Sequence, residues 1–329
     1  MTRRKAKGIG LLSGGLDSIL AVKVLQEQDL ELVGITFVTP FFGPGPGLKA
    51  GRMAGISVRA VDIGQVHLEM LKNPRYGYGS NMNPCIDCHG LMLREATRIL
   101  EEEGADFLFT GEVLGQRPMS QRRDALNAVE KLSGLSGRIL RPLSAKLLAP
   151  TLVEQEGLVD RERLLDIHGR GRKRQMELAA RYGITDYSQP GGGCMLTKEG
   201  FSRKLRELLA TLPEAGVREV ELLKCGRHFR LPGGSILSLG RSKADNDRLH
   251  RLASQRDVIL KVPSHPGPTG VLFGGEGIPR DLQTAAHIVT AYSDVGEGEK
   301  VDVVWKKGTE KGTLTVKNMG RGSFAEFFI

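Results

Sequence analysis

The chain has 329 residues, with 47 Lys and Arg against 38 Asp and Glu, which gives a formal net charge of +9. This length predicts two domains, and the absence of an apolar run of about 18 residues excludes a membrane-spanning helix. No signal-peptide stretch follows the basic N-terminus, so we expect a cytoplasmic protein without a membrane partner. The positive charge indicates a polyanionic partner, RNA first, although a basic surface without a specific partner would give the same balance.

Predicted strands alternate with predicted helices in the first part of the chain. An apolar strand at 7–12 is followed by a polar turn and a helix at 16–28, whose apolar residues are spaced by three and four. The further predicted elements are strands at 31–38, 56–63, 106–112 and 138–143 and helices at 89–105, 164–184 and 197–213. This alternation is typical of an α/β fold with a doubly wound parallel sheet, in which ligands bind at the carboxyl ends of the strands.

The pattern changes near Pro213. Short strand candidates follow at 217–231, 235–242, 257–263, 269–275, 300–308 and 312–318, with helices at 243–255 and 279–293. This texture predicts a second, smaller α+β domain. We therefore expect one domain over 1–212 and another over 213–329.

The polar turn after the first strand reads Ser13-Gly14-Gly15-Leu16-Asp17-Ser18. Its glycines let backbone N–H groups face a ligand, and the helix that follows favours an anion at its N-terminus. Ser13 and Ser18 add hydroxyl donors. Asp17 would repel phosphate, so its presence indicates that it holds Mg²⁺ or orients the loop. The alternative is a turn in which one of these side chains merely caps the helix.

This turn resembles the SGGxDS signature of the PP-loop ATP pyrophosphatases, which cut ATP between its α- and β-phosphates and adenylate an oxygen. The resemblance implies a HUP-like fold in which Ser13, Gly14, Gly15, Asp17 and Ser18 bind the pyrophosphate part of ATP. The segment Thr110–Gln121 resembles one in tRNA 4-thiouridine synthetases. The same resemblance extends to Ile139–Leu143, and it places Cys194 at the position of the catalytic cysteine. Further ATP contacts are expected at Thr36, Gly111 and Gln116.

Much of Leu239–Lys317 resembles the RNA-binding domain of the NFACT proteins. Its basic side chains are suited to neutralising phosphates, and Trp305 and His265 are candidates for stacking on bases. A solvated basic face with Trp305 in the core is the alternative. The basic candidates are Arg227, Arg230, Arg241, Lys243, Arg248, Arg251, Lys261, Lys306 and Lys307.

The chain has four cysteines, too few for a disulfide framework. Cys85 and Cys88 are spaced to reach one metal, and we expect the helix N-terminus that follows Pro84 to stabilise their thiolates. Resemblance to RNA thiolases that lack a rhodanese domain implies that Cys85, Cys88 and Cys194 hold a [4Fe-4S] cluster whose open iron carries hydrosulfide, with Gly191–Gly193 allowing a close approach. A persulfide on Cys194, or a structural zinc pair beside a buried Cys194, are the alternatives. Cys225 is expected to be structural.

Together these features predict an ATP-dependent tRNA uridine thiolase in which Asp17, Cys85, Cys88 and Cys194 are catalytic. Its partners would be tRNA and sulfide or a sulfur donor, and a homodimer stays open. The Leu-Gly-Gln segment favours 4-thiouridine, at uridine 8, as the product. A PP-loop ligase of a small molecule, 2-thiouridine formation by a persulfide route, and an RNA-binding protein without turnover are the alternatives.

Overall fold

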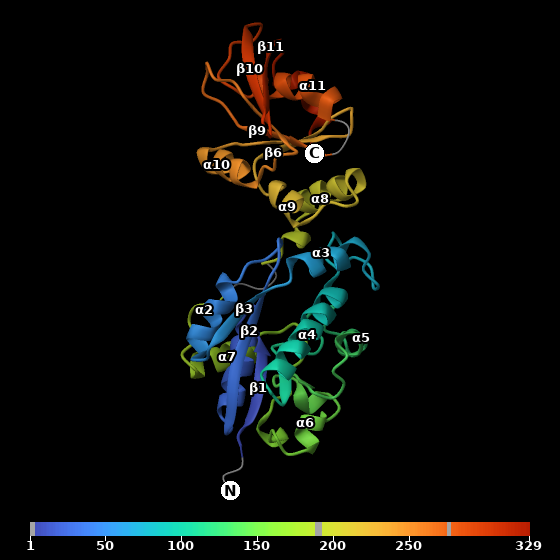
Figure 1. Cartoon of the computed structure of the whole chain (residues 1–329). Coiled ribbons are helices and arrows are strands. Elements are labelled where there is room, and N and C mark those ends of the chain that lie inside the picture. The colour runs from blue at the N-terminus through green and yellow to red at the C-terminus, as the bar shows by residue number, and fades with distance from the viewer. Residues whose placement is uncertain (1–3, 188–192, 275–277) are drawn as a thin grey trace. The chain divides into compact units, whose positions relative to one another are not determined.

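A computed structural model describes residues 4–187, 193–274 and 278–329 (Figure 1). The chain divides into two compact units, Met1–Thr197 and Lys198–Ile329. The helix predicted before Pro213, α8 (Glu199–Thr211), therefore lies in the second unit rather than in the first. Within the described ranges, no helix is long and apolar enough to cross a membrane.

The first unit is built on a five-stranded sheet in the order β3-β2-β1-β4-β5. Its strands are β1 (Ala6–Leu11), β2 (Leu30–Val38), β3 (Val58–Asp62), β4 (Phe107–Thr110) and β5 (Ile139–Leu140). Every pairing in this sheet is parallel, which confirms the α/β fold predicted from the alternation of elements. Leu11 lies opposite both Ile35 and Thr110, so the carboxyl ends of the three central strands meet at one edge.

Helices cover both faces of this sheet (Figure 1). Their bounds are α1 (Leu16–Gln26), α2 (Gly45–Ala54), α3 (Gly64–Lys72), α4 (Cys85–Glu102), α5 (Arg123–Ser133), α6 (Leu152–Gln155) and α7 (Lys173–Arg181). One core joins α1, α2 and α7 to Phe107 and Phe109, and the other joins α4 and α5 to Ile9 and Leu108. Alternate residues of β4 thus enter opposite cores, which explains why its first three residues are all apolar.

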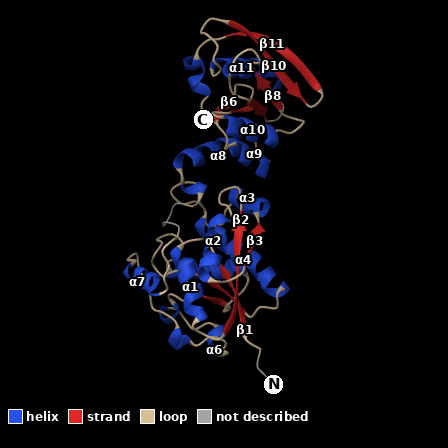
Figure 2. Cartoon of the chain, turned by 90° about the vertical axis from the view of Figure 1, so that its left-hand side faces the viewer, coloured by secondary structure: helices blue, strands red, loops and turns tan. Residues whose placement is uncertain are grey.

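The second unit holds a six-stranded antiparallel sheet in the order β11-β10-β8-β9-β7-β6. Figure 2 shows β10 and β11 as its long strands. The strands are β6 (Arg227–Arg230), β7 (Ile236–Leu239), β8 (Val258–Lys261), β9 (Gly270–Phe273), β10 (Lys300–Lys307) and β11 (Glu310–Lys317). Its helices besides α8 are α9 (Val217–Leu222), α10 (Lys243–Leu252) and α11 (Ile278–Ala291). This sheet and its helices confirm the predicted α+β character.

The expected strand over 217–231 is wrong in its first half, which forms α9. Glu219 accepts a 2.9 Å hydrogen bond from the backbone N–H of Gly216, and this satisfies a donor at the start of the helix. Val220 and Leu223 are buried at helical spacing, so a three-residue period operates where strand alternation was expected.

Candidate functional site

The loop Ser13–Ser18 connects β1 to α1 at the carboxyl edge of the parallel sheet. Gly14 has φ +86°, and a Cβ there would lie 2.4 Å from the Cβ of Pro46. Both the conformation and the space therefore require glycine. The Ser18 hydroxyl donates a 2.7 Å hydrogen bond to the Gly15 carbonyl, and the Gly15 N–H lies 3.4 Å from Ser13 Oγ. The loop is thus ordered by its own hydroxyl groups at a helix N-terminus.

Asp17 is held by side chains from distant parts of the chain. Its Oδ2 accepts a 2.6 Å hydrogen bond from Gln116 Nε2, and Gln116 Oε1 in turn accepts one of 3.0 Å from Gln175 Nε2 on α7. The Oδ1 atom is buried without a hydrogen bond, and its nearest cation, Arg172 Nη2, lies 3.8 Å away. An orphaned carboxylate oxygen beside a phosphate loop fits a cation ligand, so Mg²⁺ suits Asp17. Arg172 and Gln175 stand in no sequence motif that marks them as partners of this loop.

Gly111 lies directly against the loop. A Cβ at Gly111 would be 2.4 Å from the backbone nitrogen of Ser18 and 2.6 Å from the Asp17 carbonyl oxygen. The segment Thr110–Gln121 therefore brings Gly111 and Gln116 to Ser13–Ser18. Thr36 is buried on β2, where a Cβ at Gly47 of α2 would lie 2.2 Å from its Oγ1. It occupies the same edge of the sheet, beneath the start of α2.

Cys85 and Cys88 form the first turn of α4, directly after Pro84. Asn83 Nδ2 donates a 3.3 Å hydrogen bond to Cys85 Sγ, and His67 Nε2 lies 3.2 Å from Cys88 Sγ. Burial raises the pKa of the Cys88 thiol well above its usual value, and nearby Cys194 and Cys85 raise it further. Burial also raises the pKa of Cys194, with a contribution from Cys85. The three thiols are therefore close enough to interact electrostatically.

These pKa directions correct one expectation. The helix N-terminus was expected to stabilise the Cys88 thiolate, but burial outweighs that effect, so the thiol form is favoured. Among the described residues, no three His, Cys, Asp or Glu side chains are gathered as a metal site. A ligand with positive charge would be needed to draw these buried thiols into the thiolate form.

Hydrogen bonds order the short turn that carries Cys194. The Met195 N–H donates a 3.2 Å hydrogen bond to the Phe41 carbonyl, and Asn81 Nδ2 donates one of 2.9 Å to the Thr197 carbonyl. The Cys194 carbonyl also accepts a 2.8 Å bond from the Thr197 hydroxyl. Of the three glycines expected to allow a close approach, Gly191 and Gly192 lie outside the described residues.

Glu112 connects the loop region to the cysteine helix. Its carboxylate lies 3.0 Å from His89 Nδ1, accepts a 3.0 Å bond from Arg141 Nε and another of 3.0 Å from Thr110 Oγ1. Burial opposes its ionisation, but Arg141 and His89 prevail and lower the pKa of Glu112 to about 2. His89 follows Cys88 on α4, so Glu112 contacts the helix that carries the cysteines. The preceding residue, Gly111, contacts the phosphate loop. Glu112 belongs to the motif Thr110–Gln121, but the motif alone does not indicate this role.

Four of the nine basic candidates in the second unit contact another side chain. Arg230 pairs with Glu207 at 3.5 Å, Arg241 with Asp245 at 3.2 Å and Arg248 with Glu221. The guanidinium of Arg227 lies 5.0 Å from the ring centroid of Tyr292. The other five form no ion pair among the described residues: Lys243, Arg251, Lys261, Lys306 and Lys307.

The two aromatic candidates and Cys225 are placed by packing. Trp305 packs against the core, where a Cβ at Gly312 on the neighbouring strand would lie 2.7 Å from its ring. His265 lies 2.9 Å from Ser264 Oγ and 3.6 Å from Glu299. Cys225 is fully buried and lies 3.6 Å from the Glu221 carbonyl, in the second unit.

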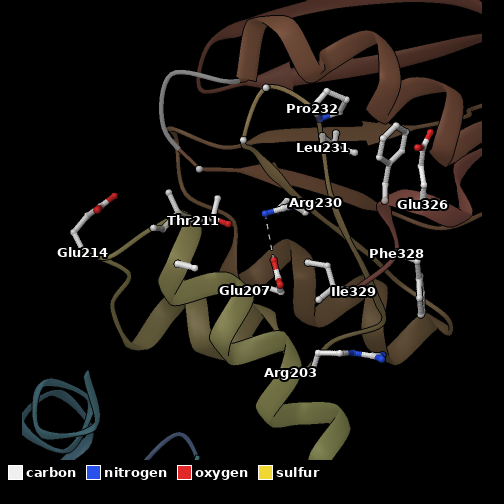
Figure 3. A pocket seen from close by; sticks show the side chains of 16 residues that line it. Arg203, Glu207, Thr211, Glu214, Arg230, Leu231, Pro232, Glu326, Phe328 and Ile329 are labelled. Atoms are coloured by element: carbon white, nitrogen blue, oxygen red, sulfur yellow. Dashed lines mark ion pairs between the residues drawn. The ribbon is translucent and has the colours of Figure 1, made fainter. Parts of the chain in front are cut away.

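A separate pocket with a volume of about 1130 Å³ lies in the second unit (Figure 3). The Arg230–Glu207 pair crosses it, and Arg203 and Phe328 stand at its wall. Its lining includes no residue of the phosphate loop or the cysteine turn. It is therefore distinct from the candidate site on the parallel sheet.

Sequence comparison places the chain near enzymes that act on tRNA. Residues 226–328 match the NFACT protein RNA binding domain. The chain is 35% identical over 117 residues to a tRNA-specific 2-thiouridylase MnmA of Pelobacter propionicus, covering 30% of this chain and 31% of that protein. It is 29% identical over 160 residues to a probable tRNA sulfurtransferase of Lysinibacillus sphaericus, covering 46% and 38%. The chain thus spans about a third of the length of these curated relatives.

The solved structures that match the chain are more distant in sequence. A predicted subunit of tRNA methyltransferase from Methanocaldococcus jannaschii gives a TM-score of 0.35 at 15% identity, covering 53% of this chain and 74% of that one. The C-terminal part of a fibronectin/fibrinogen-binding protein from Streptococcus suis gives 0.27 at 13%, covering 74% and 94%. Over part of its length the chain is thus similar to enzymes named for tRNA thiolation, and its residues 226–328 match the NFACT protein RNA binding domain.

Proposed function

We propose that this chain is an ATP-dependent tRNA uridine thiolase. The observation that carries the proposal is the double contact of Thr110–Gln121, whose Gly111 lies against Ser18 while its Glu112 binds His89 next to Cys88. One short segment thus joins an anion-binding loop to a group of interacting thiols. The curated relatives named for tRNA thiolation, and the RNA-binding match, support tRNA as the substrate.

The proposed reaction has two steps. In the first step, a uridine carbonyl oxygen attacks the α-phosphorus of ATP, pyrophosphate leaves, and the oxygen is adenylated. In the second step, sulfide adds to the carbon that bears this oxygen, and AMP leaves with the oxygen. Ser13, Gly15 and Ser18 bind the pyrophosphate part through hydroxyl and N–H groups at the N-terminus of α1. Asp17, oriented by Gln116, would hold Mg²⁺, which supplies charge stabilisation to the phosphates when bound.

We propose that Cys85, Cys88 and Cys194 bind a [4Fe-4S] cluster. The resemblance to RNA thiolases implies these three cysteines, and iron–sulfur clusters are held by cysteine thiolates. Such a cluster would supply a seat for hydrosulfide near the adenylated uridine. The chain's own part is to keep the cysteines partly buried, to order the turn of Cys194 through Met195 and Thr197, and to hold Cys85 and Cys88 through Asn83 and His67.

The product is proposed to be 4-thiouridine, at uridine 8, on the resemblance carried by Leu114, Gly115 and Gln116. A second candidate is 2-thiouridine, because three of the curated relatives are named 2-thiouridylases. Both products use the same adenylation chemistry and differ in the carbonyl presented to ATP. Identifying the product nucleoside therefore distinguishes the two candidates.

The test is tRNA thiolation by anaerobically purified protein with ATP, Mg²⁺ and sulfide, followed by mass spectrometry of digested tRNA. We expect 4-thiouridine, with one AMP and one pyrophosphate formed per sulfur inserted. Asp17→Ala is expected to abolish pyrophosphate release while leaving the far-UV circular dichroism unchanged. ATP cleavage that needs no RNA would instead indicate a ligase of a small molecule, and 2-thiouridine would establish the second candidate.

A further inference from the structure

Five lysines share one exposed face of the antiparallel sheet. Residues directly opposite each other in a sheet point to the same side, and residues two apart on one strand do as well. Lys306 lies opposite Lys311, Lys300 opposite Lys317, and Lys261 opposite Val304. We call this surface the lysine face; it consists of Lys261, Lys300, Lys306, Lys311 and Lys317, and all five are exposed.

The other side of the same strands is buried. Val301, Val303 and Val316 are core residues there, packed with Ala285 and Val289 of α11. Trp305 also belongs to that side. The lysine face is therefore the solvent side of β8, β10 and β11, and it presents cations without a stacking aromatic ring.

The charge on this face has no internal partner. None of the five lysines forms an ion pair within the described ranges. The carboxylate of the nearby Asp302 instead accepts a 2.6 Å hydrogen bond from the Thr315 hydroxyl. Like charges directly opposite each other destabilise a strand pair, and this happens at both Lys306–Lys311 and Lys300–Lys317. Lysines that protect a sheet edge would explain those of β11, which is the outer strand, but not those of β10 and β8.

We propose that the lysine face binds the phosphate backbone of the RNA substrate, an inference that rests on the proposed tRNA function. Lysine is a point charge suited to phosphate, and the face offers no aromatic platform, so binding there positions RNA without reading its sequence. From Lys300 to Lys306 the strand extends roughly 20 Å, and three strands span roughly 10 Å, which is room for several consecutive phosphates.

The test is binding of fluorescently labelled tRNA to the full chain, without ATP, over a series of salt concentrations. The variant carries Lys261→Gln, Lys306→Gln and Lys311→Gln. We expect its affinity to fall at least roughly tenfold at about 0.1 M salt, and the slope of log affinity against log salt to lose about 2 to 3, one for each phosphate contact. Arg280→Gln, on the helix α11 that covers the opposite side, is the matched control and should bind within about twofold of the wild type.

Folding of the variant is checked by its thermal midpoint, which should be no lower than that of the wild type because Lys306→Gln removes a repulsion. Unchanged affinity and salt slope in the triple variant would overturn the proposal, as would a wild-type protein that binds no RNA at about 50 mM salt. Because binding is measured apart from catalysis, the two proposals fail separately. A protein that binds tRNA through this face but forms no thiouridine would refute the enzyme and leave the surface established.

Discussion

Replacing Glu112 by Gln tests whether the buried charge network at the centre of the site stabilises the fold. Glu112 is 7% exposed and Arg141 is 5% exposed, so removing the carboxylate leaves a guanidinium buried with less compensation. Breaking such a pair by removing one partner typically costs about 3 to 5 kcal/mol. The effect on stability should therefore be large, although the side-chain shape is conserved.

The pH dependence gives an independent magnitude. The pKa of Glu112 is lowered from 4.5 to about 2, which corresponds to about 3 kcal/mol of stabilisation at neutral pH. Because the folded-state pKa is lowered, this stabilisation is complete above the unfolded value near 4.5 and is lost as pH falls toward 2. The difference between wild type and Glu112→Gln should thus be about 3 kcal/mol at pH 7 and roughly half of that near pH 3.

The assay is urea unfolding followed by circular dichroism, with hydrogen exchange of peptides from β4 and α4 to assign the change to the first unit. Adding Arg141→Met to Glu112→Gln should restore part of the lost stability, because it removes the unpaired charge. A difference below about 1 kcal/mol at pH 7, or one that stays constant between pH 3 and pH 7, would refute the reasoning.

Three further predictions address the site. Gly111→Ala should strongly weaken ATP binding measured by calorimetry, because its Cβ would lie 2.4 Å from the Ser18 nitrogen, whereas Gly200→Ala, where the space is open, should not; equal affinities would contradict the placement of Gly111. Changing any one of Cys85, Cys88 or Cys194 to Ala should remove the iron chromophore of anaerobically purified protein and thiouridine formation, and Cys225→Ala should keep both; stoichiometric zinc without iron in an active protein would favour a persulfide on Cys194. Removing the chain after Thr197 should abolish tRNA binding in a gel-shift assay and retain ATP binding, and an unchanged tRNA affinity would assign RNA capture to the first unit.

The sequence predicted the five strands of the first unit together with α1, α4 and α7, because their signals are local, but it did not indicate α2, α3, α5 and α6. Apolar runs and a glycine-rich turn define β1, the loop and α1 without reference to the rest of the chain. The second unit was also predicted as α+β, although α9 was predicted as a strand. A helix of six residues has fewer than two turns, so its apolar residues repeat too few times to show a helical period.

The partners of the site residues were less predictable, because they come from distant segments. Arg172 reaches Asp17 across more than 150 residues of sequence, and Gln175 bonds Gln116, which in turn bonds Asp17. His67 reaches Cys88 from a helix that the sequence did not indicate. These residues stand in no motif that would have marked them. Gln175 is buried on α7, but its neighbours Lys173 and Arg174 are exposed, so the sequence around it reads as a polar surface.

The adjacency of Gly111 and Glu112 constrains how this chain can change in length. Successive residues of extended chain point to opposite sides, so Gly111 turns toward the loop while Glu112 turns toward α4. Inserting or deleting one residue between Phe109 and Glu112 would exchange these directions and place a carboxylate against the phosphate loop. A single insertion here would therefore disable both halves of the site at once.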